Sequence, residues 1–517
     1  MPLRSGADYL AALRDGREVY LDGRRVEDVT AEPGLAPVAR TFAGIYDLAQ
    51  SQEYRDALTF EDERGERVSG NWLQPRTAEE LAWRRGLTQT VARQTGGLFG
   101  RAPDYVPLFH LGMLDIKDEF SRGDARFERN IVDYFAHARD NDLALAHAFV
   151  DVQAPADVPV EETAVPRVVA RKEDGIVVRG VKTIATFAPF ADEILVGAFP
   201  RPGLQDEHVL YFSLPIATPG LRVVARQPYG GGSPFDHPVS VFGDENDSMV
   251  IFDDVLVPWE RVFSEIGDVS FCARVFPRIS EWAHWSILCR LAVKAEVLTG
   301  LYALIPELIG REKQPQSQEA VGEAVRYLVA LRSFVHAAES RASVSASGLL
   351  MPDPITVTAG RAYSVENYRR ITGFLHDIAS QGLINVPTEA MLDNEVVGPV
   401  LEHALSTAVG SARDRARLLR LAWDLVCDSY GGRQTLFELF NALPFVAQRG
   451  QLVARFDLEP LKELARATAG LSPIADAEAA LAAAERRLGP DYQAVGVAYT
   501  SYGGQRKLDS TVVRSSS

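Results

Sequence analysis

Cysteine is scarce in this chain, and long apolar runs are absent. The 517 residues include three cysteines, Cys272, Cys289 and Cys427, without the paired spacing of a zinc or iron–sulfur site. Scattered free thiols are typical of a reducing compartment. No stretch reaches the roughly 18 uncharged apolar residues that cross a bilayer, and charges interrupt the apolar positions near the N-terminus. We therefore expect a soluble, cytoplasmic protein with neither a membrane span nor a secretory signal.

Basic residues are also in deficit. The sequence has 54 Lys and Arg against 70 Asp and Glu, which gives a formal net charge of −16 at pH 7. This excess of negative charge argues against nucleic acid and against an anionic membrane as partners. Hydrophobic residues (46%) and charged residues (24%) are at ordinary levels for a soluble globular protein. A chain of this length exceeds what one hydrophobic core supports, so two or three domains are expected.

Two common binding motifs are missing. No Gly-x-Gly-x-x-Gly sequence follows a predicted strand, so the chain lacks the dinucleotide-binding fingerprint for NAD(P)H or FAD. The glycine run 230–232 precedes Ser-Pro-Phe rather than a helix, which argues against a phosphate-binding loop. Asp253 and Asp254 invite a metal interpretation, but nothing nearby completes a ligand set, so no metal is expected there.

The hydrophobic pattern changes character along the chain. Residues 7–14 predict a short helix, and residues 17–26 predict a hairpin with Asp-Gly at its turn. From about residue 38 to 145 the period is helical. Short β-type runs then fill residues 165–263, with Asp253-Asp254 as one of the separating turns. Six or more strands without intervening helices suggest a compact β-barrel or sandwich.

A helical period returns after Pro258. One face of a predicted long helix, with Lys294 and Glu296 off that face, carries Leu291, Ala295, Leu298, Tyr302 and Ile305. Another helix is predicted to begin at Ser411, which with Asp414 is close to a capping box, and to end before Gly431.

These patterns predict four segments. Residues 1–145 form an N-terminal mainly helical domain, 146–264 a middle β domain and 265–485 a C-terminal helical bundle. Residues 486–517, Ser-rich at their end, are expected to be a mobile tail.

Arg101, Tyr105 and His147 supply a permanent cation, a phenol and an imidazole, the set needed to bind a phenolic substrate and take its proton. The run Gly96–Gly100 interrupts the helical pattern just before Arg101, and such a turn can present a side chain to a cleft. Two plainer explanations stay open: the turn is simply a helix–helix connection, and a lone histidine is more often a structural hydrogen-bonding residue.

Six segments together resemble one family. They are Gly100–Val106, Ala146–Val150, Gly180–Thr186, Gly232–Pro238, Ile251–Phe263 and Tyr430–Arg433. In this order, over roughly residues 5 to 470, they resemble the oxygenase component of the two-component 4-hydroxyphenylacetate 3-monooxygenases. The resemblance implies an acyl-CoA dehydrogenase-like α+β fold, with an N-terminal helical domain, a middle β-barrel domain and a C-terminal four-helix bundle. It also implies a homotetramer or homodimer.

The resemblance further implies an FADH2-dependent aromatic monooxygenase. Noncovalent reduced FAD and O2 would form a C4a-hydroperoxyflavin that hydroxylates a phenol ortho to its hydroxyl group. A separate NAD(P)H:flavin reductase would supply the FADH2, which agrees with the missing dinucleotide fingerprint. The phenolic substrate is expected to be free or tethered to a carrier protein, in bacterial aromatic catabolism or antibiotic biosynthesis.

Residue roles also follow from the resemblance. Arg101 would stabilise the substrate oxyanion, His147 would accept its proton and Tyr105 would fix the hydroxyl group, with the division between Arg101 and His147 left open. The segments expected to bind the flavin contribute Gln153, Lys182, Thr183, Thr186, Gly431, Gly432 and Arg433. Because Thr183 and Thr186 do not alternate along a strand, a bend between them is implied.

Several of these residues have plainer interpretations. Lys182 is equally well explained as an exposed strand charge, and Gly431 as a helix C-cap. His237, in a rigid Ser-Pro-Phe-Asp-His-Pro turn, is interpreted as a hydrogen-bond anchor rather than a catalyst. The chain also departs from the family pattern at Ala148 and at Asp151-Val152, which leaves the identity of the phenol open.

Three rival functions compete with this interpretation. A 4-hydroxybutyryl-CoA dehydratase would need cysteines near residues 101–105, where Arg101 and Tyr105 stand, so it is excluded. An acyl-CoA dehydrogenase-like flavoenzyme would need a glutamate base, and its signatures are not evident. A non-catalytic scaffold of the same fold is disfavoured by the retained Arg, Tyr and His.

Overall fold

The N-terminal part of the chain is helical, as its sequence pattern predicts. The computed structural model describes residues 3–101, 103–122, 124–155, 157–200, 203–264, 269–441 and 445–471. The first helices are α1 (Gly6–Ala12), α2 (Ala36–Gln50), α3 (Arg55–Leu58), α4 (Ala78–Gln94), α5 (Tyr105–Asp115), α6 (Lys117–Ser121) and α7 (Ala125–Asp140). Ser5 and Asp8 form a capping box at the start of α1. After α4, Gly96 (φ 60°) and Gly97 (φ 74°) take the left-handed conformation, so the glycine run does break the helix before Arg101.

The predicted Asp-Gly hairpin is present. Strands β1 (Glu18–Leu21) and β2 (Arg24–Val26) are antiparallel, and Asp22 (φ 49°) and Gly23 (φ 76°) between them have the positive φ values of a type I′ turn. Strand β1 also pairs in parallel with β11, which joins this N-terminal hairpin to the main sheet.

The β segment forms two sheets. Its strands are β5 (Leu145–Ala148), β6 (Val150–Asp151), β7 (Arg167–Arg171), β8 (Gly175–Thr186), β9 (Glu193–Val196), β10 (Tyr211–Pro215), β11 (Leu221–Val224), β12 (Asp247–Pro258) and β13 (Val262–Ser264). A seven-stranded sheet has the order β2-β1-β11-β12-β8-β6, with β7 paired to β8, and a four-stranded sheet has the order β13-β10-β9-β5. Two small hairpins lie elsewhere, β3 (Thr59–Glu61) with β4 (Arg67–Ser69) and β14 (Ser343–Val344) with β15 (Leu350–Met351).

The expected middle β-barrel is not closed, and this part of the fold prediction is corrected. Among the described strands each sheet keeps two free ends, and the edge strand β2 is three residues long with exposed Arg24 and Arg25, which discourages further pairing. The sheets meet through side chains instead, and the Phe212 ring on β10 lies 5.9 Å from the Phe252 ring on β12. A two-sheet packing, the sandwich alternative, therefore describes the segment better.

Asp253 and Asp254 do not end a strand, contrary to the expectation of a turn. Strand β12 continues through them to Pro258, and its register against β8 shifts between Phe252 and Val255. Asp254 has φ 53°, and its carboxylate pairs with Arg179 on the exposed surface. A bulge absorbs the two polar residues while the strand keeps its direction.

The implied bend before Thr186 is also a bulge. Ile184 has φ 53°, and the register of β8 against β12 shifts opposite it, between Ser248 and Val250. Thr183 and Thr186 therefore do not follow simple alternation, as the sequence spacing indicates.

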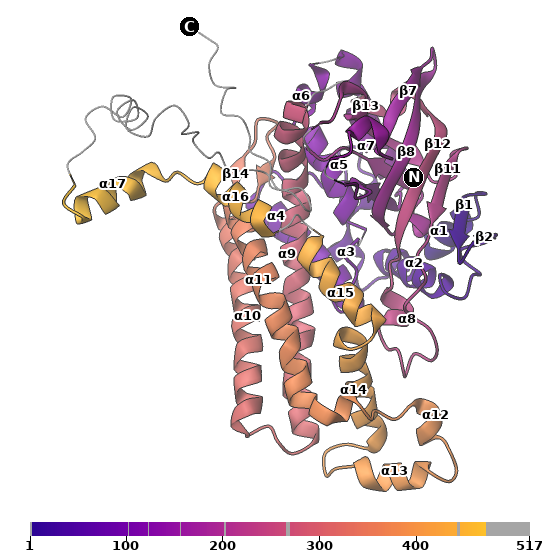
Figure 1. The fold of residues 1–517 in the computed structure, drawn as a ribbon, viewed down its shortest axis with the longest axis vertical. Coiled ribbons are helices and arrows are strands. Elements are labelled where there is room, and N and C mark those ends of the chain that lie inside the picture. Colours follow the sequence, from indigo (N-terminus) through magenta and orange to yellow (C-terminus); the bar gives the residue numbers. More distant parts are fainter. Residues whose placement is uncertain are drawn as a thin grey trace. The chain divides into compact units, whose positions relative to one another are not determined.

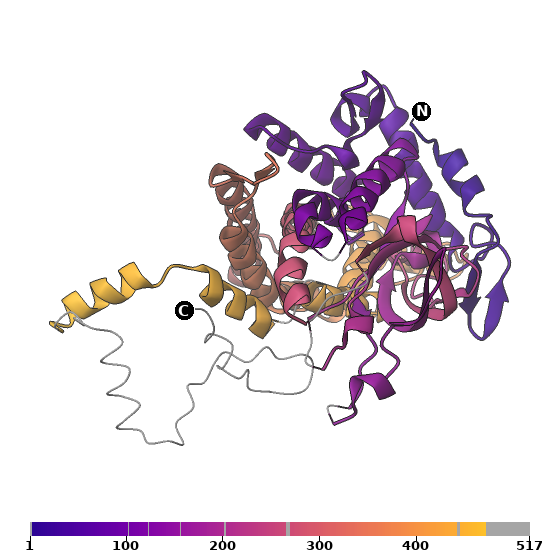
Figure 2. The same cartoon turned by 90° about the horizontal axis from the view of Figure 1, so that it is seen from above.

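Long helices form the C-terminal part of the first unit. They are α9 (Val269–Leu308), α10 (Pro315–Ser340), α11 (Pro354–Ala379), α14 (Ala412–Val426) and α15 (Ser429–Phe440), with the shorter α8 (Ser240–Gly243), α12 (Glu389–Leu392) and α13 (Gly398–Leu405). Figure 1 shows α9, α10 and α11 side by side, and α14 packs against α9 and α11 as the fourth helix of the bundle. Seen from above, the curved strands and the three long helices lie on different sides of this unit (Figure 2).

The predicted apolar face of the long helix and the predicted start of α14 are confirmed. The five apolar positions from Leu291 to Ile305 are all buried, and α14 begins with the Ser411–Asp414 capping box. Helices α4 and α5 pack on α9, so the loop between them, which carries Arg101, lies near the bundle.

The chain separates into two units, at residues 1–442 and 443–517. The second contains α16 (Phe445–Arg455) and α17 (Glu459–Thr468). The tail expected at 486–517 lies outside the described residues. Over the described residues, no helix combines the length and the apolar character that crossing a membrane requires.

Candidate active site

Arg101 stands on the loop between α4 and α5. A Cβ on Gly100 would lie 2.0 Å from Cζ of Phe437, so any larger residue at position 100 would displace this ring or the loop. Arg101 itself is 4% exposed. Its guanidinium carbon lies 4.4 Å from the centroid of the Tyr105 ring and 5.1 Å from that of Phe437, which places the cation between two aromatic faces.

The guanidinium of Arg101 has no carboxylate partner within the described residues. Its Nη1 donates to the Gly100 carbonyl at 3.3 Å, and its Nε has no hydrogen-bond partner. Arg84, also fully buried, differs because its guanidinium donates to three backbone carbonyls at 2.7 to 3.0 Å. Since a buried, uncompensated charge is costly, Arg101 is suited to an anion that arrives with a ligand.

Tyr105 and His147 lie beside this cation. Tyr105 begins α5, His147 lies on β5, and their ring centroids are 5.6 Å apart. Burial, and then the charge of Arg101, lower the pKa of His147 well below its usual range, so the imidazole is neutral at pH 7. Its Nδ1 is buried without a hydrogen-bond partner. The structure thus brings together all three residues of the predicted catalytic set.

An unperturbed imidazole titrates near neutrality, and His147 differs in this respect. The His147 ring contacts the Phe109 and Phe149 rings at centroid distances of 5.4 and 5.0 Å, and these apolar surroundings penalise the imidazolium. His147 can accept a hydrogen bond or a proton, but it retains a proton poorly until a negative charge lies next to it.

Asp104 was not predicted from the sequence, although it positions Tyr105. It is 1% exposed, and its Oδ2 accepts hydrogen bonds from the hydroxyls of Thr88 on α4 (2.7 Å) and Ser286 on α9 (2.9 Å). These bonds fix the first turn of α5 to both helices that flank it.

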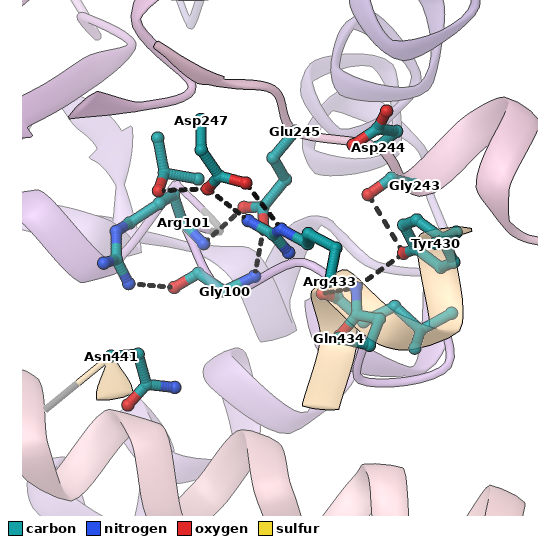
Figure 3. A network of polar contacts seen from close by, with 12 residues as sticks. Gly100, Arg101, Gly243, Asp244, Glu245, Asp247, Tyr430, Arg433, Gln434 and Asn441 are labelled. Atoms are coloured by element: carbon teal, nitrogen blue, oxygen red, sulfur yellow. Dashed lines mark hydrogen bonds and ion pairs between the residues drawn. The ribbon is translucent and has the colours of Figure 1, made fainter. Parts of the chain in front are cut away.

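Thr186 and Arg433, both expected to bind the flavin, are joined by Asp247. The Thr186 hydroxyl donates to Asp247 Oδ1 at 2.7 Å, and Arg433 donates from Nε to Oδ2 (2.7 Å) and from Nη2 to Oδ1 (2.6 Å). Figure 3 shows Arg433 reaching from α15 between Asp247 and Glu245. Asp247 and Glu245 raise the pKa of Arg433 despite its burial, and Arg433 lowers the pKa of Asp247. The Nη1 atom of Arg433 has no hydrogen-bond partner.

Lys182 is buried, so its interpretation as an exposed strand charge is wrong. The residue is 3% exposed, and its Nζ donates to Asp151 Oδ1 at 2.6 Å and to the Phe149 carbonyl at 3.0 Å. Asp151 is one of the positions where the chain departs from the family pattern, and here it is the counterion of a flavin-site candidate. Thr183 is half-buried and pairs with Val150 across the β6–β8 ladder.

Gln153 is not brought into this group. It is exposed, in the loop after β6.

Gly431 and Gly432 lie in the first turn of α15, so the interpretation of Gly431 as a C-cap is wrong. Asp428 is the N-cap, and its carboxylate accepts the N–H groups of Tyr430 and Gly431 at 2.9 and 3.1 Å. A Cβ on Gly431 would lie 2.7 Å from the backbone nitrogen of Val426, which explains a glycine where α15 turns back on α14. Gly432 is exposed, and a Cβ added there would meet no atom within 4 Å.

His237 lies close to two carboxylates. Its Nδ1 is 3.7 Å from Asp428 and 4.0 Å from Asp424, beyond hydrogen-bond distance, and it has no hydrogen-bond partner. The predicted hydrogen-bond anchor is therefore not formed through this atom. Among the described residues these three side chains are also the group closest to a metal-ligand arrangement.

A buried charge cluster under the Arg101 loop was missed. Arg290 and Lys294 on α9 bind Glu438 on α15 at 2.8 Å, and Arg290 Nη1 also donates to the Gly97 carbonyl at 2.6 Å. Lys294 was placed off the buried face because charged residues are usually exposed, yet it is 2% exposed. No local sequence signal links residues some 140 positions apart in this way.

Family models match nearly the whole described chain. The model described as 4-hydroxyphenylacetate 3-hydroxylase N terminal matches residues 5–264, and the one described as 4-hydroxyphenylacetate 3-hydroxylase C terminal matches residues 272–470. The chain belongs to this family. The resemblance inferred from the sequence motifs is thereby confirmed.

Individual relatives agree. The chain is 38% identical to the 4-hydroxyphenylacetate 3-monooxygenase oxygenase component of Thermus thermophilus, over 90% of this chain and 97% of that protein. It is 35% identical to a 4-nitrophenol 4-monooxygenase/4-nitrocatechol 2-monooxygenase oxygenase component of Rhodococcus opacus, over 90% and 91%. A crystal structure of a 4-hydroxyphenylacetate 3-monooxygenase oxygenase component complexed with FAD superposes with a TM-score of 0.86 at 37% identity, over 90% of this chain and 98% of that chain.

Two further matches are less similar in sequence. An archaeal 4-hydroxybutyryl-CoA dehydratase from N. maritimus has a TM-score of 0.82 at 20% identity, over 92% and 96% of the two chains, and this likeness concerns the fold alone. A Streptomyces globisporus relative, 32% identical over 84% of each protein, is named as a (3S)-3-amino-3-(3-chloro-4-hydroxyphenyl)propanoyl-[peptidyl-carrier protein] monooxygenase.

Proposed function

We propose that this chain is the oxygenase component of a two-component, FADH2-dependent monooxygenase that hydroxylates a phenol ortho to its hydroxyl group. The observation that carries the proposal is the buried guanidinium of Arg101, which has no described carboxylate partner and lies beside a neutral His147 and the Tyr105 ring. A phenolate would supply the missing negative charge. The family membership supports the same chemistry.

Arg101 would make the substrate more nucleophilic by favouring its ionised form. A free phenol has a pKa of about 10, so ionising it at pH 7 costs roughly 4 kcal/mol. A cation at hydrogen-bond distance lowers such a pKa by about 1 to 3 units. His147, neutral before binding, would take the phenolic proton or a hydrogen bond, and Tyr105 would orient the oxygen. The division of these tasks between Arg101 and His147 stays open.

The residues near Arg101 also suit a noncovalently held flavin. Thr186 and Lys182 come from the C-terminal part of strand β8 and Arg433 comes from α15, and Arg433 Nη1 is a buried donor without a hydrogen-bond partner. We propose that these residues, with Gln153, Thr183, Gly431 and Gly432, hold FADH2 delivered by a separate NAD(P)H:flavin reductase. Bound reduced flavin and O2 would supply the electrophilic oxygen.

Aromatic side chains next to His147 would exclude water from the candidate site. Phe149 contacts Phe109, Phe199 and Phe276 at centroid distances of 5.1, 6.2 and 5.6 Å, so one side of the imidazole faces a continuous apolar surface. A dry site strengthens the attraction between Arg101 and a phenolate.

The test supplies FADH2 from any flavin reductase, under air, with a panel of phenols that are free or bound as thioesters to a carrier protein. Formation of a catechol from any member, lost in Arg101→Lys because the fork geometry is lost, supports the proposal. If no phenol is converted and all reducing equivalents appear as hydrogen peroxide, the proposal fails. Flavin reduction by an acyl-CoA thioester would instead favour an acyl-CoA dehydrogenase-like enzyme. Sedimentation of the same protein tests the expected homotetramer or homodimer.

A further inference from the structure

Glu245 holds the backbone on which Arg101 stands. Its side chain is fully buried, its Oε2 accepts the N–H of Gly100 at 2.8 Å, and its Oε1 accepts the N–H of Arg101 at 2.5 Å. Both oxygens of one carboxylate therefore bind two successive peptide groups, 144 and 145 residues away in the sequence. Charge-assisted hydrogen bonds of this kind are stronger than neutral ones and fix direction as well as distance.

The same carboxylate is connected to the strand end where Thr186 lies. Arg433 Nη1 is 3.6 Å from Glu245 Oε2, and the other two nitrogens of Arg433 bind Asp247. Asp247 in turn accepts the Thr186 hydroxyl and is its register partner on the neighbouring strand. One chain of polar contacts thus runs from the Arg101 backbone through Glu245, Arg433 and Asp247 to Thr186. Figure 3 shows the part of this chain from Arg101 to Asp247.

The burial of this network has an energetic consequence. Burial raises the pKa of Glu245, and Arg433, the two backbone N–H groups and Arg101 oppose that rise. The partners of Glu245 favour its ionised form. In some proteins, a buried ionic group that adds no stability is retained because it specifies a geometry. Glu245 touches the peptide groups of the Arg101 loop but not its guanidinium.

We propose that Glu245 is a positioning residue for the hydroxylation reaction. It fixes the Arg101 guanidinium, which would hold the phenolate, at a set distance from Thr186, which would lie against the flavin. The inference rests on the proposed function for its chemical meaning, since the distance matters only if phenol and flavin bind at its two ends. Misplacement of about 1 Å at a reacting centre can reduce a rate by roughly 100-fold.

Glu245→Gln tests the proposal with little change in shape. A glutamine offers one acceptor, and its amide nitrogen would face the second backbone N–H, donor against donor. Asp244→Asn is the matched control: Asp244 is also a buried carboxylate of this segment, but it binds Arg226 and the N–H of Tyr229 and makes no bond to the Arg101 loop. Both variants lose one buried acidic group, but only Glu245→Gln loses a carboxylate oxygen that accepts a backbone N–H of residue 100 or 101.

Three measurements follow, with the full-length protein, FADH2 and a converted phenol. Glu245→Gln is expected to raise the KM for the phenol about 10- to 100-fold and to divert FADH2 oxidation from catechol toward hydrogen peroxide. Amide hydrogen exchange in a peptide spanning residues 96–105 is expected to become faster. Asp244→Asn is expected to leave the product-to-peroxide ratio and this exchange rate as in the wild type, even where it lowers the melting temperature.

The outcomes separate the two proposals. Wild-type exchange and wild-type coupling in Glu245→Gln, or equal changes in both variants, overturn the positioning role. If the wild-type protein converts no phenol, the proposed function fails, while the exchange measurement still decides whether Glu245 holds the loop. If Glu245→Gln does not fold, Glu245→Asp, which keeps the charge and shortens its reach, is expected to show the same faster exchange and lower coupling.

Discussion

Replacement of Arg101 by methionine is expected to abolish phenol ionisation without destabilising the protein. The side chain is 4% exposed, and within the described structure its guanidinium directly contacts two aromatic faces and donates to one carbonyl at 3.3 Å. Methionine of similar length removes a charge that lacks a buried counterion. We therefore expect the free energy of unfolding of the ligand-free protein to stay within about 1 kcal/mol of the wild type or to rise.

The same change should remove the attraction for phenolate. If Arg101 lowers the pKa of a bound phenol by about 1 to 3 units, its loss disfavours the bound anion by roughly 1.4 to 4 kcal/mol, which is about 10- to 1000-fold in affinity for the phenolate relative to the neutral phenol. The assay is a spectrophotometric pH titration of a bound chromophoric nitrophenol, with urea denaturation run in parallel. An unchanged pKa of the bound phenol in Arg101→Met would refute the assigned role, and a large loss of stability would refute the claim that the charge is uncompensated.

Other variants test the surrounding structure. Glu438→Gln leaves Arg290 and Lys294 without their carboxylate, and denaturant titration should show a loss of about 3 to 5 kcal/mol, against less than about 1 kcal/mol for the exposed Glu463→Gln. These cations lower the pKa of Glu438 to about 2. The difference in free energy of unfolding between wild type and Glu438→Gln should therefore have its maximum value above pH 4.5 and disappear as the pH falls toward 2. A difference that grows on acidification would contradict this sign. Gly431→Ala should lower the melting temperature because its Cβ meets the backbone of Leu425 and Val426, whereas Gly432→Ala should not. Equal effects of the two alanines would show that the close helix contact is wrong.

The candidate catalytic side chains could be proposed from the sequence because they stand in short motifs. Arg101 follows a glycine run that breaks a helical period, Tyr105 opens the next helix, and His147 lies in an apolar strand. Local pattern also located the hairpin at Asp22-Gly23 and the helix start at Ser411, since turns and caps depend on a few adjacent residues.

The supporting residues could not be found in this way because their partners are distant in sequence. Glu245 and Asp247 lie in an acidic run that has the composition of a loop, and only the fold sets it against residues 100, 101 and 433. Lys294 breaks the apolar pattern of its helix, and its burial depends on Glu438 on another helix. Asp253-Asp254 has turn composition, but pairing with the long strand β8 carries β12 through it.

The buried cations near the candidate site differ in whether a carboxylate of the protein pairs with their side-chain charge. Arg290 and Lys294 share Glu438, Arg433 is held by Asp247, and Lys182 is held by Asp151. Each of these charges is matched within the protein and so stabilises a particular arrangement of helices and strands. At Arg101 the backbone N–H, not the guanidinium, is bound by a carboxylate, that of Glu245. This arrangement supports the proposal that the side-chain charge serves a ligand, because the carboxylate that binds the backbone makes no hydrogen bond or ion pair with the guanidinium.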